Sequence, residues 1–278
     1  MNILLENILA HADPTQVAGL ARFFKTGPGQ YGEGDKFLGI KVPVTRAVVK
    51  DCWRALVPAP GAARGVSKTA DEREASGDAP AAPGTMFPEL EECMASEYHE
   101  VRLAALLALV EIFKHAPRSA PPQTAESLRQ ECINFYLAHT GRINNWDLVD
   151  LSCYPLLGEW LLDKDRSLLY DLARNGKTLW EQRIGIVSTM AFIRQGQLED
   201  TFAIADILLY HPHDLIHKAV GWLLREAGKR DKSALEAFLQ GPDPDAPRYR
   251  SMPRTALRYA IERFPEAERQ AYLSGRAH

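Results

Sequence analysis

The chain has 278 residues, of which 46% are hydrophobic and 25% are charged, and its formal net charge is −3. This length and composition are typical of a globular protein with a substantial core, and the slightly acidic balance excludes a general attraction to polyanions. The sequence has neither a run of about 18 apolar residues nor the basic start of a secretory signal, so we expect a cytoplasmic protein that stays out of membranes.

The N-terminal part of the sequence predicts two helices. Asp13 is a favourable N-cap and Pro14 a favourable first helical residue, and apolar residues follow at helical spacing. Pro43 opens a second pattern of this kind. Nearly every later apolar pattern has the same period, and no alternating run of β-branched residues lies between hairpin turns. The sequence therefore predicts an all-α fold.

Composition divides the chain into three parts. Residues 1–53 carry the N-terminal helices, and residues 54–88 are rich in Ala, Pro and Gly. The second part has too few large apolar side chains to pack, which predicts a flexible insertion at the surface. Residues 89–278 carry further helices, with a short break at 116–122. We expect all of them to form one domain, residues 1–278.

Cysteines and several tryptophans are predicted to lie in the core. No C-x-x-C pair occurs, and the cysteines stand among apolar helical neighbours, which indicates small core residues instead of a metal site or disulfides. These residues are Cys52, Cys93, Cys132 and Cys153, together with Trp53, Trp160 and Trp180. For Trp180, a place at a surface cleft is the alternative.

Four helical patterns resemble one another. Each opens with a basic residue and continues with small and apolar residues, and these basic residues are Arg102, Arg183, Lys218 and Arg254. The last three are 35 and 36 residues apart, within or close to the repeat length of stacked helix pairs. We therefore predict an α-α superhelix (solenoid) of antiparallel helix pairs, with the second helix of each pair lining a concave face.

The four basic residues are expected to form a row on that face. Phosphate groups of a polyanion are the partner that such a row fits. The alternative is that each residue is independently solvated or pairs with a neighbouring acidic residue.

The repeat between Arg102 and Arg183 departs from the pattern. Its helix carries Trp146 and Asp150, four residues apart and therefore on one helical face. A carboxylate in a cationic row repels phosphate, so the pair of an indole and a carboxylate indicates a specific cationic target. The alternative is that Asp147 or Asp150 accepts hydrogen bonds from a buried arginine or caps a helix.

Two further patterns carry less information. The glycines at positions 27, 29 and 32 match G-x-G-x-x-G, but no strand precedes them and a proline lies among them, so we interpret the segment as a flexible connection. The histidines at positions 211, 213 and 217 lack a cysteine or paired carboxylate to complete a metal site, so we expect them at a helix start. No cofactor or metal is predicted.

Four segments carry a resemblance to a known family. They are residues 37–43 with Arg46, residues 146–150, residues 180–183 and residues 218–226. Together they span most of the chain in the right order. The chain resembles the AlkD-like HEAT-repeat family of DNA alkylation repair glycosylases.

The resemblance implies an active cleft formed by Trp146, Asp150, Arg183 and Trp222. It implies hydrolysis of the N-glycosidic bond of cationic alkylated purines, 3-alkyladenine and 7-alkylguanine, in double-stranded DNA. Asp150 would stabilise the sugar cation, the two tryptophans would flank the lesion, and Arg183 would hold a backbone phosphate. The remaining expected DNA-binding residues are Arg102, Lys218, Arg254, Lys41 and Arg46. We expect a monomer without an obligate protein partner.

Two departures keep other functions open. Phe23 stands where glycosylases of the family have a tyrosine, and residues 54–88 are longer than the family requires. The first alternative is a non-catalytic HEAT-repeat protein that binds damaged or branched DNA. The second is a protein-interaction scaffold.

Overall fold

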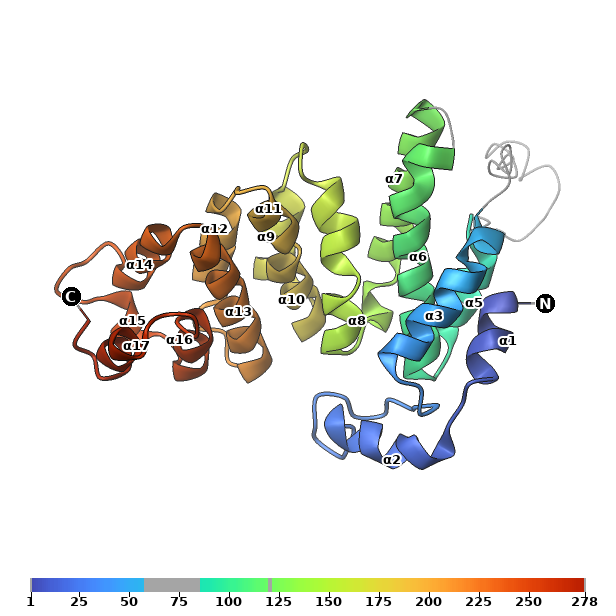
Figure 1. Ribbon diagram of the computed structural model, residues 1–278, viewed down its shortest axis with the longest axis horizontal. Coiled ribbons are helices and arrows are strands. Elements are labelled where there is room, and N and C mark those ends of the chain that lie inside the picture. Colours follow the sequence, from blue (N-terminus) through green and yellow to red (C-terminus); the bar gives the residue numbers. More distant parts are fainter. Residues whose placement is uncertain (1, 58–85, 120–121, 278) are drawn as a thin grey trace, which may run out of the picture. The chain divides into compact units, whose positions relative to one another are not determined.

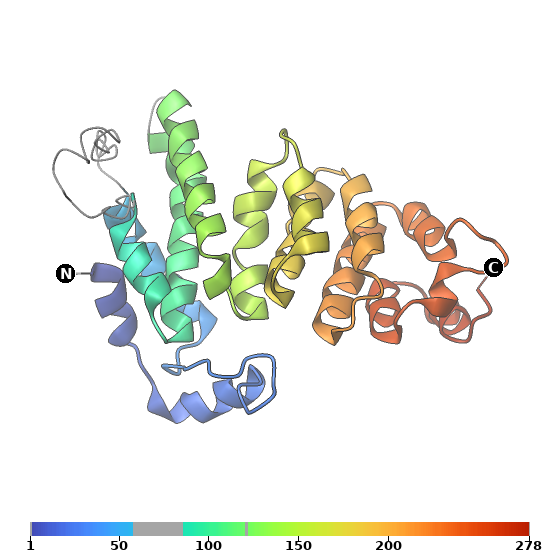
Figure 2. The same cartoon turned by 180° about the vertical axis from the view of Figure 1, so that it is seen from behind.

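The computed structural model describes residues 2–57, 86–119 and 122–277. Helices account for the secondary structure throughout this part of the chain, and no strand is assigned in it (Figures 1 and 2). The all-α fold class is confirmed. The chain divides into two compact units, Met1–Arg142 and Ile143–His278, which are described separately. The single repeat domain expected from the sequence stays a prediction.

The first unit is built around one long buried helix. Its elements are α1 (Ile3–Leu9), α2 (Pro14–Phe23), α3 (Val42–Cys52), η1 (Trp53–Leu56), α5 (Pro88–Ala95), α6 (His99–Ser119), α7 (Pro122–Ala138) and η2 (Thr140–Arg142). Helix α6 contacts α1, α3, α5 and α7, and its residues 101–110 are all buried. The core of the unit therefore surrounds α6.

The second unit is a series of packed helices. Its elements are α8 (Trp146–Asp150), η3 (Tyr154–Gly158), α9 (Ser167–Asn175), α10 (Leu179–Val187), α11 (Met190–Arg194), α12 (Glu199–Leu208), α13 (Asp214–Arg230), α14 (Lys232–Gln240), α15 (Arg248–Ser251), α16 (Arg254–Ala260) and α17 (Glu266–Leu273). Helix α10 packs on α9, and α13 packs on both α12 and α14. These contacts are those of stacked helix pairs.

The repeat spacing matches the packing of the second unit. Arg183, Lys218 and Arg254 lie on α10, α13 and α16, and α13 contacts both of the other helices. Gly221 permits the close crossing of α13 and α16, because a Cβ at this position would lie 2.5 Å from the carbonyl oxygen of Ala256. The spacing of 35 and 36 residues therefore corresponds to one layer of the stack.

The helix start predicted at Asp13 is confirmed. The Asp13 side chain accepts a hydrogen bond from the backbone N–H of Thr15 at 2.9 Å, and Pro14 is the first helical residue. Helix α2 nevertheless has no buried residue, and Phe23 at its end is 59% exposed. The neighbouring Phe24 is buried and stacks on Phe37 with 5.2 Å between ring centroids. Phe24 and not the helix itself therefore anchors this end of α2.

The predicted surface insertion is wrong at both of its ends. Leu56 and Phe87 are buried in the core, and the chain is already helical at η1 and again from Pro88. These two large apolar residues pack although the segment between them is poor in such residues. The remainder of the prediction, residues 58–85, lies outside the described residues. The break predicted at 116–122 is shorter in the structure, because α6 continues to Ser119.

A buried carboxylate fixes the segment that precedes α3. Glu100 accepts hydrogen bonds from the backbone N–H groups of Leu38, Gly39 and Ile40 at 2.9, 2.9 and 3.0 Å. Gly39 has φ +89°, and a Cβ there would lie 1.9 Å from the carbonyl oxygen of Asp13, so only glycine fits. These contacts explain why the chain takes this conformation at residues 38–40 and why residue 39 is a glycine.

Arg102 is buried beside a second carboxylate, which corrects its predicted place in the basic row. Its Nη2 donates to Asp35 Oδ1 at 2.5 Å, and His99 Nδ1 lies 2.8 Å from Asp35 Oδ2. Burial raises the pKa of Asp35, but the hydrogen bond with His99 and the charge of Arg102 outweigh it and lower the pKa. With 2% of its surface exposed, Arg102 ties α6 to the segment around Asp35 and cannot contact DNA phosphates.

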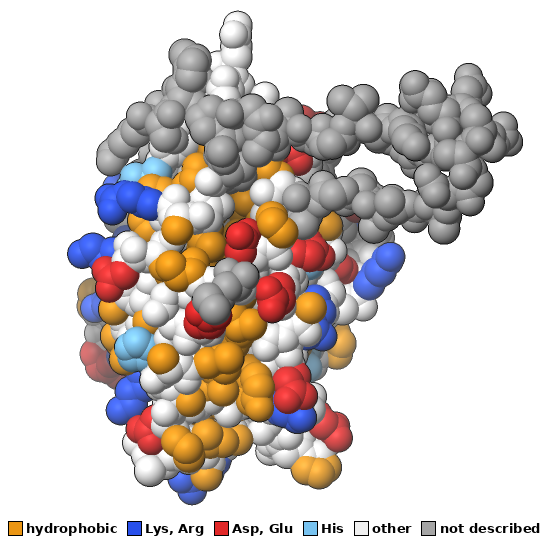
Figure 3. All heavy atoms as spheres, turned by 90° about the vertical axis from the view of Figure 1, so that its right-hand side faces the viewer, with side chains coloured by type: hydrophobic (Ala, Val, Ile, Leu, Met, Phe, Trp, Pro, Cys, Tyr) orange, Lys and Arg blue, Asp and Glu red, His pale blue; other side chains and the backbone are white. Residues whose placement is uncertain are grey.

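The predicted core residues are buried. All four cysteines are free and buried, as are Trp53, Trp160 and Trp180. On the outer side of unit 1, Ile3 and Leu9 of α1 are exposed, and hydrophobic side chains gather on the face shown in Figure 3. Helix α1 therefore packs on the core of the unit while Ile3 and Leu9 stay exposed among the described residues.

We predict that Glu100→Ala lowers the free energy of unfolding by about 3 kcal/mol, because three buried N–H groups lose a charged acceptor. Chemical denaturation with circular dichroism measures this change. Glu97→Ala is the control, because its ion pair with Lys36 is exposed at both partners, and it should have little effect. Equal losses in the two variants would contradict this account of the 37–43 segment.

Candidate functional site

The candidate site begins at α8, a single short helix with a buried middle. The Asn145 side chain caps it by accepting a hydrogen bond from the N–H of Trp146 at 2.9 Å. Residues 147–149 are buried, whereas Trp146 and Asp150, the first and last residues, are partly exposed. The helix therefore presents the indole and the carboxylate, four residues apart, on its accessible side.

Asp150 forms a bidentate ion pair with Arg183 of α10. Arg183 Nε donates to Asp150 Oδ1 at 2.8 Å and Nη2 donates to Oδ2 at 2.7 Å. The third nitrogen of the guanidinium, Nη1, also donates a hydrogen bond, to the carbonyl oxygen of Leu215 in α13 at 2.6 Å. Arg183 therefore ties α8 and α13 to α10 through one side chain.

Arg183 is more enclosed than the sequence prediction of a phosphate-binding residue implied. Its side chain is only 6% exposed and its donors already face Asp150 and Leu215, so the guanidinium does not offer a free phosphate-binding fork. The alternative considered for Asp150, that it accepts hydrogen bonds from a buried arginine, is confirmed. Asp147 is buried, and its Oδ1 accepts from the N–H of Leu148 within the helix.

The Asp150 carboxylate remains available despite this ion pair. Its side chain is 14% exposed, and each oxygen accepts only one hydrogen bond from Arg183, which leaves lone pairs for a further partner. Burial raises the pKa of Asp150, and the adjacent Arg183 counteracts part of that rise. A fixed and partly desolvated carboxylate of this kind favours a cationic partner.

The two tryptophans of the expected cleft lie on the helices that flank α10. Trp146 belongs to α8 and Trp222 to α13, and α10 contacts both of these helices. Both indoles are partly exposed. The structure therefore brings Asp150 and Arg183 into direct contact and sets the tryptophans on neighbouring helices of the same unit. These aromatic faces suit a cation.

The expected DNA-binding residues have different environments. Lys41 and Arg46 are exposed at the start of α3, and Arg254 is exposed at the start of α16. Lys218 pairs with Asp214 at 3.0 Å. For this residue, the alternative stated for the basic row, pairing with a neighbouring acidic residue, is the one observed. Such an exposed pair can exchange its partner for a phosphate at little cost.

Arg258 was not among the predicted DNA-binding residues. It lies one turn after Arg254 on α16, both side chains are exposed, and neither forms an ion pair with a residue in the described ranges. Tyr259 and Tyr210 are exposed in the same unit. The i, i+4 spacing of the two arginines is visible in the sequence.

The weaker motifs remain structural. The 27–32 segment consists of turns, and Gly29 takes a positive φ of 71°. No group of three or more His, Cys, Asp or Glu side chains within the described residues could hold a metal ion. The histidines near residue 213 lie at the start of α13, as expected.

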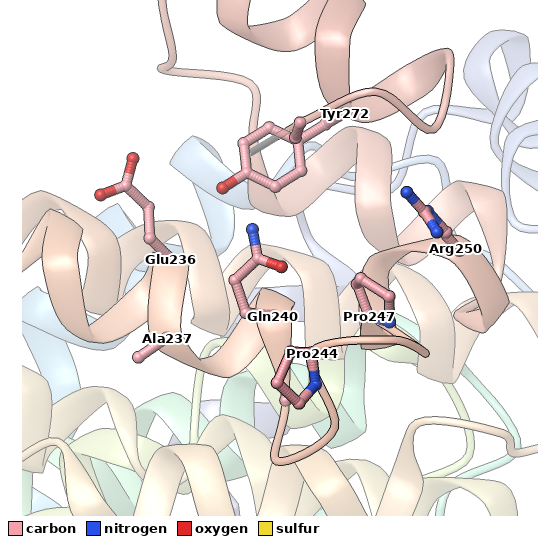
Figure 4. A pocket seen from close by; sticks show the side chains of 9 residues that line it. Glu236, Ala237, Gln240, Pro244, Pro247, Arg250 and Tyr272 are labelled. Carbon is pink, nitrogen blue, oxygen red and sulfur yellow. The ribbon is translucent and has the colours of Figure 1, made fainter.

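A cavity of about 550 Å³ lies elsewhere in the second unit (Figure 4). The end of α14, the 241–247 segment, α15 and α17 surround it, and Glu236, Gln240, Arg250 and Tyr272 contribute its polar groups. Glu236 is paired with Lys232, and Arg250 donates to the carbonyl oxygen of Gly275. The cavity contains none of the predicted site residues, and its mixed lining points to no particular chemistry.

The comparisons with known proteins identify the family. A family model described as DNA alkylation repair enzyme matches residues 4–72 and 64–264. The chain belongs to the DNA alkylation repair enzyme family. This result confirms the resemblance found in the sequence, and membership indicates a repair enzyme whose substrate is DNA.

A solved structure shows the same fold. It is described as a predicted DNA alkylation repair enzyme from Enterococcus faecalis, with a TM-score of 0.60 and 14% identity, covering 92% of this chain and 97% of that chain. At this identity the similarity supports the fold alone. The comparison with curated proteins gave no match.

The part of the chain that the structure describes contains no helix long and apolar enough to cross a membrane. Cytoplasmic location, the monomeric state and independence of a protein partner stay predictions.

We predict strong energetic coupling between Asp150 and Arg183. In a double-mutant cycle of Asp150→Ala and Arg183→Ala, the coupling should be at least about 2 kcal/mol, because either single change leaves a buried charge without its partner. Denaturant unfolding of the four proteins measures it. The exposed Glu266 and Arg269 pair provides a control cycle with coupling near zero. Coupling as weak as in the control would show that the ion pair does not fix the site.

Proposed function

We propose that this protein is a DNA glycosylase that hydrolyses the N-glycosidic bond of cationic alkylated purines in double-stranded DNA. One observation carries the proposal: Asp150 is partly exposed and fixed in orientation by the buried Arg183. Trp146 and Trp222 lie on the two helices that flank the arginine. An oriented carboxylate with aromatic faces suits a substrate that carries positive charge.

The substrate supplies its own leaving group. Alkylation at N3 of adenine or N7 of guanine gives the base a positive charge and weakens the glycosidic bond, so no acid is required to protonate the departing base. Bond cleavage moves positive charge onto the deoxyribose, as in other glycosyl transfers. A neutral purine lacks this advantage, which restricts the substrates to cationic lesions.

Asp150 has two tasks in the proposed mechanism. Its negative charge stabilises the oxocarbenium-like sugar, and its free lone pairs orient the water that attacks C1′. Arg183 holds the carboxylate in place and limits its protonation. Each tryptophan contributes about 0.5–2 kcal/mol of cation–π attraction when its face lies on the charged nucleotide.

DNA binding in this proposal relies on exposed cations. Lys41, Arg46, Arg254, Arg258 and Lys218 can contact phosphates, and such contacts position the duplex without reading its sequence. The net charge of −3 means that the attraction depends on these local groups and not on the protein as a whole.

A non-catalytic protein that binds damaged or branched DNA is the second candidate. The observation in its favour is that Arg183 already balances the charge of Asp150. Phe23 is also 59% exposed and offers no hydroxyl group. A protein-interaction scaffold, the third class, gives no reason for an oriented carboxylate in a unit whose neighbouring helices carry partly exposed tryptophans.

Release of bases from alkylated DNA tests the proposal. Methylated duplex DNA is incubated with excess protein, and free 7-methylguanine and 3-methyladenine are measured by chromatography. We expect both bases to appear together with abasic sites. Binding of the same DNA without release of either base would support the non-catalytic candidate, and absence of binding at low salt would support the scaffold.

We predict that Asp150→Asn slows excision by about 10²-fold or more while DNA affinity stays equal or increases, because the lost charge acts on the transition state. Single-turnover kinetics and a binding titration measure the two effects. Asp163→Asn is a matched control in the same unit, because Asp163 is exposed and pairs only loosely with Lys164. An unchanged rate in Asp150→Asn would remove the carboxylate from the mechanism.

We predict that Arg254→Ala and Arg258→Ala each weaken DNA binding uniformly across sequences. Each should reduce the slope of log affinity against log salt by about 1, because one phosphate contact is lost. Lys232→Ala is the control, since Lys232 is already paired with Glu236 and Glu268. Identical salt dependence in all four proteins, wild type included, would place DNA away from α16.

A further inference from the structure

Three histidines at the start of α13 form a connected set that the proposed reaction does not use. The N–H of His213 donates to His211 Nδ1 at 3.0 Å, and the N–H of Leu215 donates to His213 Nδ1 at 3.1 Å. His217 Nε2 donates to the carbonyl oxygen of His211. His213 is thus the N-cap of α13, and His211 supports the residue that caps.

These hydrogen bonds define the protonation of two rings. A backbone N–H can only donate, so Nδ1 of His211 and Nδ1 of His213 are acceptors and carry no proton. The proton of each ring is therefore on Nε2, and both rings are neutral. His211 Nε2 lies 2.9 Å from Gln182 Oε1, which fits an N–H donor facing an amide oxygen. Both rings must stay neutral for the cap to hold.

The histidine cap touches α10 next to the candidate site. Gln182 is the neighbour of Arg183 on α10, and Leu215 accepts from Arg183 Nη1 with its carbonyl oxygen while its N–H is held by His213. Leu215 therefore joins the histidine cap to the guanidinium of Arg183. Any shift of the first turn of α13 moves an anchor of Arg183.

We propose that His213, supported by His211, is a positioning residue for the Asp150 and Arg183 pair. Its neutral ring keeps the first turn of α13 where the Leu215 carbonyl fixes Arg183, and Arg183 in turn orients the Asp150 carboxylate. Protonation of His213 Nδ1 replaces the acceptor by a donor that faces the N–H of Leu215. The inference rests on the proposed function, in which the orientation of Asp150 sets the rate.

The charged groups around His213 favour its neutral form. On α13, Asp214 and Lys218 pair at 3.0 Å, and Asp214 also bonds the hydroxyl of Thr255 on α16. On α10, Arg183 donates to the Leu215 carbonyl oxygen and is paired with Asp150 of α8, and Glu181 is the acidic residue of its first turn. Burial lowers the pKa of His213, and His217 and Lys218 lower it further against the opposite effect of Asp214. Burial also lowers the pKa of His211.

Lowering the pH should weaken the histidine cap. The ordinary histidine pKa is 6.5, and the folded protein binds the proton less readily than the unfolded chain. The cap is therefore complete above pH 6.5, and it weakens as the pH falls through the lowered pKa. The rate of excision should fall over the same pH range.

Two variants of His213 test the inference. Asparagine is a strong N-cap acceptor that does not titrate, so His213→Asn should keep the neutral-pH rate within about 2-fold and move the acid limb of the single-turnover profile to lower pH. His213→Ala lacks the acceptor and should be slower by about 10-fold at neutral pH. The profile is measured on methylated duplex DNA between about pH 5 and pH 8.

A matched cap in the same unit provides the control. Asp231 is the N-cap of α14 and accepts from the N–H of Ala234 at 2.9 Å. Asp231→Ala should lose a similar amount of stability while it keeps the wild-type rate and acid limb. The inference is overturned if His213→Asn retains the wild-type acid limb, or if His213→Ala and Asp231→Ala have the same rates.

A second readout separates this inference from the proposed function. The Nε–H resonance of Arg183 is followed by NMR through a pH titration of the protein without DNA. In the wild type it should shift as the pH falls through the lowered pKa of His213, and in His213→Asn this part of the shift should be absent. If the wild type releases no base, the proposed function fails, and the resonance still decides whether His213 positions Arg183. A titration curve in His213→Asn that is identical to that of the wild type contradicts the inference.

Discussion

The bidentate ion pair between Asp150 and Arg183 is the interaction on which the second unit depends. Arg183 joins three helices, because its guanidinium bonds the carboxylate of α8 and a carbonyl oxygen of α13 while its backbone belongs to α10. A buried pair is costly to desolvate, so its worth lies in orientation more than in stability. The partial exposure of Asp150 leaves that orientation available to a substrate.

Each unit contains an ion pair between a buried arginine and an aspartate, and the two aspartates differ in their accessibility. In the first unit, Asp35 is enclosed by Arg102 and His99, and its side chain is only 1% exposed. In the second unit, Asp150 lies at the end of a short helix and keeps free lone pairs. Accessibility, and not the presence of an ion pair, therefore separates a structural carboxylate from a candidate catalytic one.

The helical class, the repeat spacing and the shared helical face of Trp146 and Asp150 could be predicted from the sequence, because these features follow from local periodicity. It did not distinguish Arg102 from Arg254, since both open a repeat, and only tertiary contacts with Asp35 bury the first. The contacts of Arg183 were not predicted for the same reason: its partners Asp150 and Leu215 are about one helix pair away in sequence. Arg258 was missed although its spacing from Arg254 was visible, and the histidine cap of α13 required ring geometry that no spacing reveals.

The central claim is that Asp150 stabilises positive charge on the sugar. The most direct measurement compares the affinity for two duplex DNAs, one with a cationic pyrrolidine in place of the deoxyribose and one with a neutral tetrahydrofuran. The wild type should prefer the cationic analogue by at least about 10²-fold, and Asp150→Asn should lose that preference. Equal affinities in the wild type, or a preference that survives in Asp150→Asn, would contradict the account.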